Sequence, residues 1–143
     1  MSGFLLDTNV PSEMINSRPD PRVSTWVLAQ DETTLYLSSI TIGEVRKGLI
    51  TMPAGKRRTQ LEEWMANDMI PLFIDRILPV TQAIADRWGM LSGHRQLAGR
   101  RLAMADGLIA ATALEHGLTI VTRNVRDFEN LGVTIFNPWT EAA

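Results

Sequence analysis

Cysteine is absent from this 143-residue sequence, which also contains only two histidines and one tyrosine. The absence of cysteine excludes disulfides, thiolate metal ligands and cysteine nucleophiles, and it is typical of proteins in a reducing compartment. No apolar run approaches the roughly 20 residues of a membrane helix, and the first residues lack the basic and long apolar regions of a signal peptide. We therefore expect a cytoplasmic protein without a membrane segment.

Excess positive charge is absent as well, since fourteen basic residues face sixteen acidic ones and the net charge is −2. A nucleic-acid-binding protein usually carries a basic excess, so any such role must depend on local patches. The sequence has no glycine-rich phosphate loop and no serine in a nucleophile elbow. A haloacid-dehalogenase-type phosphatase needs a second aspartate two residues after the first, and Asn9 stands at that position here.

Short apolar segments alternate with longer segments of helical periodicity along the whole chain. This alternation is typical of an α/β fold, in which a parallel sheet is covered by helices on both faces. The length suits one domain, so we expect a single domain over residues 1–143. The predicted strands are 4–6, 34–39, 76–80, 118–122 and 133–136, and the predicted helices are 10–16, 21–30, 41–51, 55–70, 81–98 and 104–116.

Asp7, Thr8 and Asn9 follow the first apolar strand directly. All three residue types cap helices well, so a plain N-cap before helix 10–16 explains them. A parallel sheet, however, binds ligands beyond the carboxyl ends of its strands, and Asp7 stands at such an end. The sequence leaves both interpretations open, and they are compatible.

Glu44 and Asp106 have similar pairs of interpretations. Glu44 follows Thr41 by three residues, which is the spacing of a capping box, but its carboxylate could equally reach the sheet edge beside Asp7. Asp106 is flanked at helical spacing by apolar residues, and burying a lone carboxylate costs several kcal/mol. Either Asp106 opens its helix as the cap, with Gly107 as the first residue, or it binds a cation.

Asn124 follows the fourth strand and could cap a short helix that has Asp127 at its third position. If strands one and four are neighbours in a parallel sheet, Asn124 lies beside Asp7. Together with Glu44 and Asp106, these residues form a set of hard oxygen ligands without histidine or cysteine, which suits Mg²⁺ or Mn²⁺. Such a cation activates water and stabilises the charge on a phosphodiester during displacement.

Four segments carry a resemblance to a known family. In order they are LLDTNV (5–10), SSITIGEVRKG (38–48), ADGLIAATALEHGLTIVTRNVRDF (105–128) and FNPW (136–139). The ordered set resembles a PIN-domain nuclease, and more narrowly the VapC-type toxins of type II toxin–antitoxin modules, FitB-like subgroup. The resemblance implies a three-layer α/β/α fold with a mostly parallel five-stranded sheet in the order 3-2-1-4-5. It also implies an endoribonuclease that depends on Mg²⁺ or Mn²⁺.

The resemblance also implies roles for individual residues. Asp7, Glu44 and Asp106 match the first three family acids, and the fourth family position falls on Asn124, where many members carry aspartate. Asp7 and Asp106 are expected to hold the metal, Glu44 to hold a metal-bound water or act as general base, and Asn124 to position water. The expected supporting residues are Thr8, Asn9, Thr122 and Asp127.

Local basic clusters predict where RNA binds, and Arg100, Arg101 and Arg123 are the candidate contacts. The resemblance implies a cognate DNA-binding antitoxin as a partner, a homodimer, and a larger hetero-oligomer with the antitoxin. Helices 21–30 and 55–70 could form an apolar groove for that partner. Two alternatives remain: a catalytically weak PIN fold that binds RNA or a partner, which Asn124 favours, and a PIN nuclease of RNA maturation or DNA processing.

Overall fold

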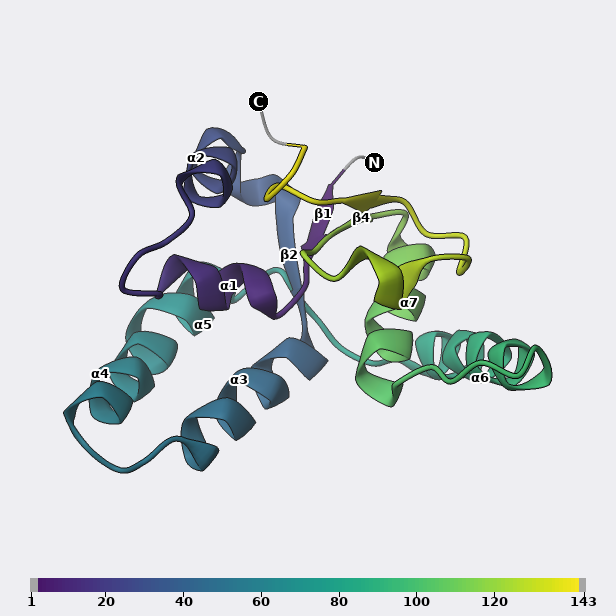
Figure 1. Ribbon diagram of the computed structural model, residues 1–143, viewed down its shortest axis with the longest axis horizontal. Helices are drawn as coiled ribbons and strands as arrows, with labels where there is room; N and C mark the ends of the chain where they lie inside the picture. Colours follow the sequence, from purple (N-terminus) through teal and green to yellow (C-terminus); the bar gives the residue numbers. More distant parts are fainter. Residues whose placement is uncertain (1–2, 142–143) are drawn as a thin grey trace.

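The computed structural model describes residues 3–141 and has a parallel five-stranded sheet at its centre (Figure 1). The strand order is β3-β2-β1-β4-β5, and every neighbouring pair is parallel. The order and direction confirm the expected fold class. The strands are β1 (Phe4–Leu6), β2 (Leu35–Ser38), β3 (Ile77–Leu78), β4 (Thr119–Val121) and β5 (Ile135–Phe136).

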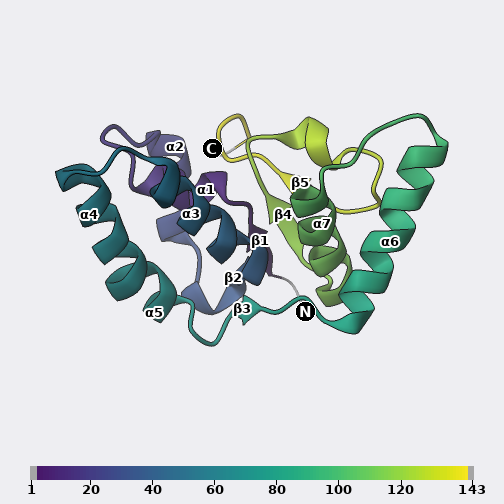
Figure 2. The same cartoon turned by 90° about the horizontal axis from the view of Figure 1, so that it is seen from below.

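Helices cover both faces of this sheet, with α1 to α5 on one side and α6 and α7 on the other (Figure 2). The first group comprises α1 (Asn9–Met14), α2 (Pro21–Ala29), α3 (Ser39–Thr51), α4 (Lys56–Trp64) and α5 (Ile70–Leu72), with a π-helical turn η2 (Met65–Met69) between α4 and α5. The second group comprises α6 (Gln82–Leu97) and α7 (Met104–His116). The described residues also form 3-10 turns at η1 (Glu32–Thr34), before β2, and at η3 (Val125–Phe128), after β4. The arrangement confirms three layers, α/β/α.

The period of two in the strands explains why two separate cores form. Successive side chains of a strand point to opposite faces of the sheet. Leu5 and Ile120 accordingly pack against α7, while Leu6 and Val121 pack against α1 to α4, and all four are almost fully buried. Because β1 and β4 are buried on both faces, their sequences, FLL and TIV, do not alternate between polar and apolar residues.

The predicted helix 55–70 is less regular than its periodicity indicates. It comprises α4, the widened turn η2 and the short α5. Pro71 is the second residue after the widened turn, and proline supplies no N–H to the helical hydrogen-bond ladder. Trp64 is partly buried against the core, as its spacing predicts.

Helix α7 ends where the sequence predicts. Gly117 has a φ of 65°, in the left-handed region that favours glycine, and the backbone N–H of Leu118 donates to the carbonyl of Ala113. The chain then enters β4 directly, which places the start of β4 beside α7. Within residues 3–141, no helix has the length and apolar character that crossing a membrane requires.

Candidate metal and nuclease site

Asp7 lies immediately after β1, and its side chain is only 5% exposed. One carboxylate oxygen accepts a hydrogen bond from the backbone N–H of Thr8 at 2.9 Å, and the other accepts one from the Thr122 hydroxyl at 2.8 Å. Thr8 is the N-cap residue of α1, but its side chain makes no capping hydrogen bond. The plain capping interpretation therefore does not account for Asp7, whose carboxylate instead joins the ends of β1 and β4.

Thr122 organises this junction. Its hydroxyl donates to Asp7 and accepts from the side-chain amide of Asn9 at 3.2 Å and from the backbone N–H of Asn124 at 3.0 Å. A hydroxyl has one donor and two acceptor positions, so all of its capacity is used. Thr122 is fully buried, and the network holds the Asp7 carboxylate in one orientation.

Glu44 reaches the same place from α3. Thr8 donates its hydroxyl hydrogen to Glu44 at 2.5 Å, across 36 positions of the sequence. The predicted capping box of Thr41 and Glu44 is wrong, because α3 begins earlier, at Ser39, and its N-cap is Ser38, which accepts from the backbone N–H of Ile40. The spacing alone could not identify Ser38 as the cap, since a threonine one turn later fits the same pattern.

Asp106 lies in the first turn of α7 but does not cap it. The N-cap is Ala103, and the helix begins at Met104, so of the two interpretations of Asp106 the one in which it opens the helix is wrong. Gly107, the next residue, is pressed against the indole of Trp88 on α6, and a Cβ at Gly107 would lie 2.7 Å from the Trp88 ring. This close approach of α6 and α7 positions the half-buried Asp106 carboxylate.

Electrostatic interactions show that the carboxylates share one site. The pKa of Asp106 is raised to about 6, first by burial and then by the negative charges of Asp127, Asp7 and Glu44 in that order. Burial also raises the pKa of Asp7, although the hydrogen bonds from Thr122 and Thr8 oppose that shift. Among residues 3–141, Asp106 has no ion pair and no side-chain hydrogen bond that would relieve the repulsion.

Asn124 and Asp127 close the site at η3, and both side chains are exposed. Asn124 is the N-cap of η3, but its side chain makes no capping hydrogen bond; its backbone carbonyl accepts from the N–H of Asp127 at 3.1 Å. The charge of Asp127 acts on both Asp7 and Asp106. The fourth carboxylate near the site is therefore Asp127, one turn beyond Asn124.

The chemistry of these donors fits a magnesium or manganese ion. Across the described range 3–141, no three aspartate, glutamate or histidine side chains come close enough to chelate an ion by themselves. Mg²⁺ does not require such a cage, because it keeps several waters and uses one or two carboxylates together with substrate phosphate oxygens. Oxygen donors and unrelieved carboxylate repulsion around Asp106 are the features such an ion would satisfy.

Arginines surround the acidic site. Arg100 and Arg101 lie in the segment between α6 and α7 and line a cavity of about 680 Å³ together with Arg126, Asp106 and Asp127. Arg123 follows Thr122, and its guanidinium stacks 5.8 Å from the centre of the Trp139 ring. Of the three arginines predicted to contact RNA, Arg100 and Arg101 therefore share a cavity with Asp106, whereas the Arg123 guanidinium lies over Trp139.

Arg95 behaves differently from its basic neighbours in the sequence. It is only 9% exposed, and its guanidinium donates to the backbone carbonyl of Glu129 at 2.7 Å and to that of Arg101 at 3.5 Å. It thus ties the segment that carries Arg101 to the end of η3. Arg95 also lines the cavity that contains Arg100 and Arg101, but its long side chain reaches inward from α6 to make these backbone contacts.

Comparisons with known proteins agree with this geometry. The family model described as "PIN domain" matches residues 4–133. VapC ribonuclease Y4jK of Sinorhizobium fredii is 42% identical over 139 residues, which cover 97% of this chain and 99% of the relative. Toxin FitB of Neisseria gonorrhoeae is 39% identical over 95% of this chain and 98% of its own length.

Solved structures give the same result. The crystal structure of FitAcB from Neisseria gonorrhoeae aligns with a TM-score of 0.90 at 39% identity, over 96% of this chain and 99% of the other. A toxin–antitoxin complex from Klebsiella pneumoniae aligns with a TM-score of 0.70 at 26% identity, over 95% of this chain and 98% of the other. The similarity extends over the sheet and both helical layers.

Proposed function

This chain belongs to the PIN-domain family, and from that premise we propose that it is the ribonuclease toxin of a toxin–antitoxin pair, with Asp7 and Asp106 as its metal ligands. The observation that carries the proposal is the convergence of side chains from four distant segments at one edge of the sheet. Asp7 is held there by Thr8 and Thr122, and Glu44 is joined to Asp7 through Thr8.

Asp7 and Asp106 are the residues that would hold Mg²⁺ or Mn²⁺. When bound, such an ion polarises a phosphodiester and lowers the pKa of a coordinated water. The protein itself supplies the orientation, because both oxygens of Asp7 accept hydrogen bonds that fix its plane. Asn124 adds no charge to this pair, so we assign it to positioning water.

Glu44 is suited to hold or deprotonate the attacking water. One of its oxygens accepts from Thr8, and no hydrogen bond within residues 3–141 occupies the other. A general base must lie within hydrogen-bond reach of the proton that it removes, directly or through one water. The Thr8 contact keeps the Glu44 side chain beside Asp7, where that water would lie.

We propose that the antitoxin occupies an apolar groove on the opposite side of α1 from the arginine clusters. The groove has a volume of about 430 Å³ and lies between α2 and the segment α4–α5, as the amphipathic pattern of residues 21–30 and 55–70 predicts. Leu28 at its rim is 78% exposed, and Leu72 is 47% exposed. An amphipathic helix would cover such a surface. The similar structure from Klebsiella pneumoniae is a toxin–antitoxin complex, which supports this occupant.

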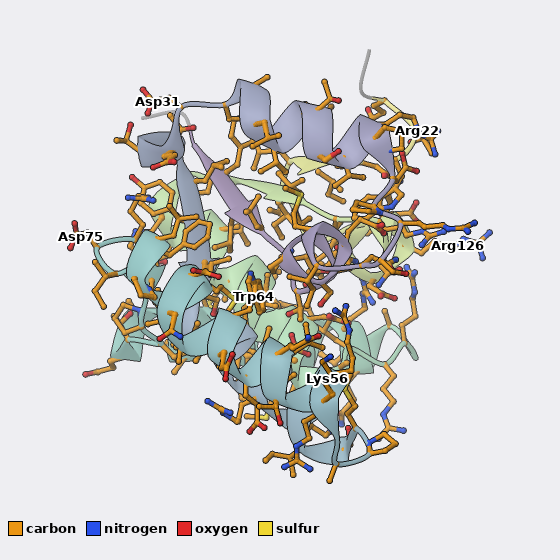
Figure 3. The ribbon with its side chains drawn as sticks, turned by 90° about the vertical axis from the view of Figure 1, so that its left-hand side faces the viewer. Arg22, Asp31, Lys56, Trp64, Asp75 and Arg126 are labelled. Atoms are coloured by element: carbon orange, nitrogen blue, oxygen red, sulfur yellow. The ribbon has the colours of Figure 1, made fainter. Side chains whose placement is uncertain are left out.

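The decisive experiment follows the cleavage of labelled structured RNAs by the antitoxin-free protein. We expect cleavage with Mg²⁺ or Mn²⁺ and none with EDTA, because the carboxylates repel one another and the scissile phosphate without a cation. Asp7→Asn is the test variant. Asp75→Asn is the matched control, since Asp75 is an exposed acid on the far side of the molecule from Arg126 (Figure 3).

Two results would contradict the proposal. Cleavage by Asp7→Asn at the wild-type rate would show that this site does not take part in the reaction. RNA binding without cleavage under any metal would favour the alternative of a catalytically weak binding module, which the uncharged Asn124 favours. We also expect a homodimer, which light scattering of the antitoxin-free protein checks.

A further inference from the structure

A second arginine pocket lies beside the carboxylates, and we propose that it binds a backbone phosphate of the same RNA strand that the site cleaves. The pocket, here called the α1–α2 pocket, contains Arg18 and Arg22 from the start of α2 and the segment before it, together with Arg123. The inference rests on the proposed ribonuclease function and gives the RNA a path across the molecule. Neither Arg18 nor Arg22 belongs to the clusters that the sequence predicts to bind RNA.

The acidic residues of this pocket are already engaged. Asp20 caps α2 by accepting from the backbone N–H of Arg22, and it also accepts from the Arg22 guanidinium at 3.1 and 2.8 Å. Glu13 accepts from the backbone N–H of Asp20 at 3.0 Å and from the indole N–H of Trp139 at 3.4 Å. Both carboxylates are thus committed to holding the walls of the pocket.

Two guanidinium groups remain without a hydrogen bond or ion pair, although that of Arg123 lies over the Trp139 ring. Arg18 and Arg123 form no ion pair and no side-chain hydrogen bond within the described part of the chain, residues 3–141. The pocket has a volume of about 640 Å³, which is within the range of ligand sites in proteins. Guanidinium groups match the geometry of phosphate oxygens, so an open pocket with two unpaired arginines favours a phosphate.

Arg123 connects this pocket to the carboxylates. Its backbone N–H donates to the side-chain oxygen of Asn9 at 3.5 Å, and the preceding residue, Thr122, holds Asp7. Its side chain extends over Trp139, which lines the α1–α2 pocket. A phosphate bound by Arg123 would therefore belong to a strand that also passes Asp7.

The cavity that contains Asp106 and Asp127 is also lined by arginines, which include Arg100, Arg101 and Arg126. Arg22 and Arg126 project from the same side of the molecule (Figure 3). A polyanion that crosses a group of carboxylates is repelled at the centre, so cations on both flanks are what would hold it in register. A regular phosphate repeat is specific to nucleic acid, which favours RNA over an acidic peptide as the occupant.

The test measures the binding of a short, single-stranded, fluorescein-labelled RNA to the inactive Asp7→Asn protein. Arg18→Gln combined with Arg123→Gln should weaken binding at least about tenfold and flatten the plot of log affinity against log salt by about 1.4, or about 0.7 for each lost phosphate contact. Lys47→Gln combined with Lys56→Gln is the control, because it removes two exposed charges from α3 and α4. Its slope should equal that of the parent.

The single variant Arg18→Gln distinguishes a lost RNA contact from a folding defect. Arg18 is exposed and lies outside any helix, so this variant should melt like the parent while losing about 0.7 of the slope. If the wild type cleaves RNA with metal but both arginine variants bind RNA like the parent, the inference is wrong and the proposed function stands. If the wild type neither binds nor cleaves RNA, the proposed function fails first.

A further measurement tests whether the purified antitoxin still inhibits the arginine variants when they are made in the active protein. Variants that bind RNA normally but are no longer inhibited by the purified antitoxin would assign the α1–α2 pocket to that protein, and the inference about RNA would be overturned. A flattened salt dependence, together with a raised KM for RNA cleavage by Arg18→Gln made in the active protein with Asp7 intact, would establish the path. A change in RNA affinity without a change in slope would mean that no phosphate contact was lost, which also contradicts the inference.

Discussion

The end of β1 and the first turn of α7 each place one carboxylate at the site. The surroundings of these two carboxylates, Asp7 and Asp106, differ in the hydrogen bonds that they offer to the negative charge. Asp7 is the more deeply buried of the two, yet hydrogen bonds from Thr8, Asn9 and Thr122 compensate its negative charge. Asp106 is only half buried, yet it meets repulsion from Asp127, Asp7 and Glu44 without a compensating donor. The protein alone therefore determines the geometry of Asp7, whereas Asp106 has no donor that offsets its charge, and a bound cation would be the partner that stabilises it.

The first and largest effect concerns activity. We expect Asp106→Asn to reduce metal-dependent RNA cleavage by at least about 100-fold, because it removes the anionic oxygen that would hold the cation. The folded structure should persist, since an amide at this half-buried position ends the repulsion by Asp127. Initial rates at saturating Mn²⁺ measure the loss, with circular dichroism as the check on folding. Wild-type rates in a folded Asp106→Asn protein would show that the two carboxylates do not act together.

The second prediction concerns the support of Asp7. Thr122→Val should destabilise the protein by about 3 kcal/mol at pH 7, because it removes the shortest of the three hydrogen bonds that the buried Asp7 carboxylate accepts. Thr122→Ser keeps the hydroxyl and loses only a methyl group, so it should cost about 1 kcal/mol. Urea unfolding of both variants separates the two contributions. Equal destabilisation by valine and serine would mean that packing, and not the hydrogen bond, is what Thr122 supplies.

Sequence reasoning located the strand ends well because apolar runs and parallel topology are local and periodic signals. It identified Asp7 at the end of β1 and Thr122 at the end of β4, and the structure brings both together. Capping was harder, because a cap and a first-turn residue have the same local pattern. Glu44 and Asp106 were ambiguous for that reason, and Ser38 and Ala103 proved to be the N-caps.

Other features depend on contacts between distant segments. The burial of Arg95 requires the carbonyl of Glu129, and the pocket around Arg18 requires Arg123 and Trp139. No spacing within the sequence reports such contacts. A glycine directly after an aspartate in a strongly apolar helix was the one available signal for the close approach of Gly107 to Trp88.

The third prediction uses the close contact between Gly107 and Trp88 to disturb only the part of the site that contains Asp106. Gly107→Ala places a methyl group 2.7 Å from the Trp88 ring, so the ring, or α6 with it, must shift away from α7. We expect about 2 kcal/mol of destabilisation and a weaker apparent affinity for Mn²⁺, with the Asp7 network intact. Gly93→Ala is the matched control, since nothing lies within 4 Å of its added Cβ. Thermal melts and a Mn²⁺ titration of cleavage measure both effects.

The smallest effect is the pH dependence of stability in EDTA. The pKa of Asp106 is about 6 in the folded protein, above its ordinary value of 3.8, so the folded state binds the proton more tightly. Its contribution to stability is fully present below about pH 4 and is lost as the pH rises through 6. The loss should be about 1 kcal/mol, because the half-exposed carboxylate is screened by solvent, and the melting temperature should fall by about 4 °C.

Two further measurements, with the Asp106→Asn variant and with added metal, distinguish the contribution of Asp106 to stability from that of Asp7. The variant should lose the part of the pH dependence that belongs to Asp106 and keep the part that belongs to Asp7, whose pKa is also raised. Mg²⁺ at pH 7.5 should raise the melting temperature of the wild type but not that of the variant, because a ligand that binds only the folded state stabilises it. If Mg²⁺ stabilises both proteins equally, Asp106 does not hold the ion, and Asp7 with Asp127 becomes the pair to test.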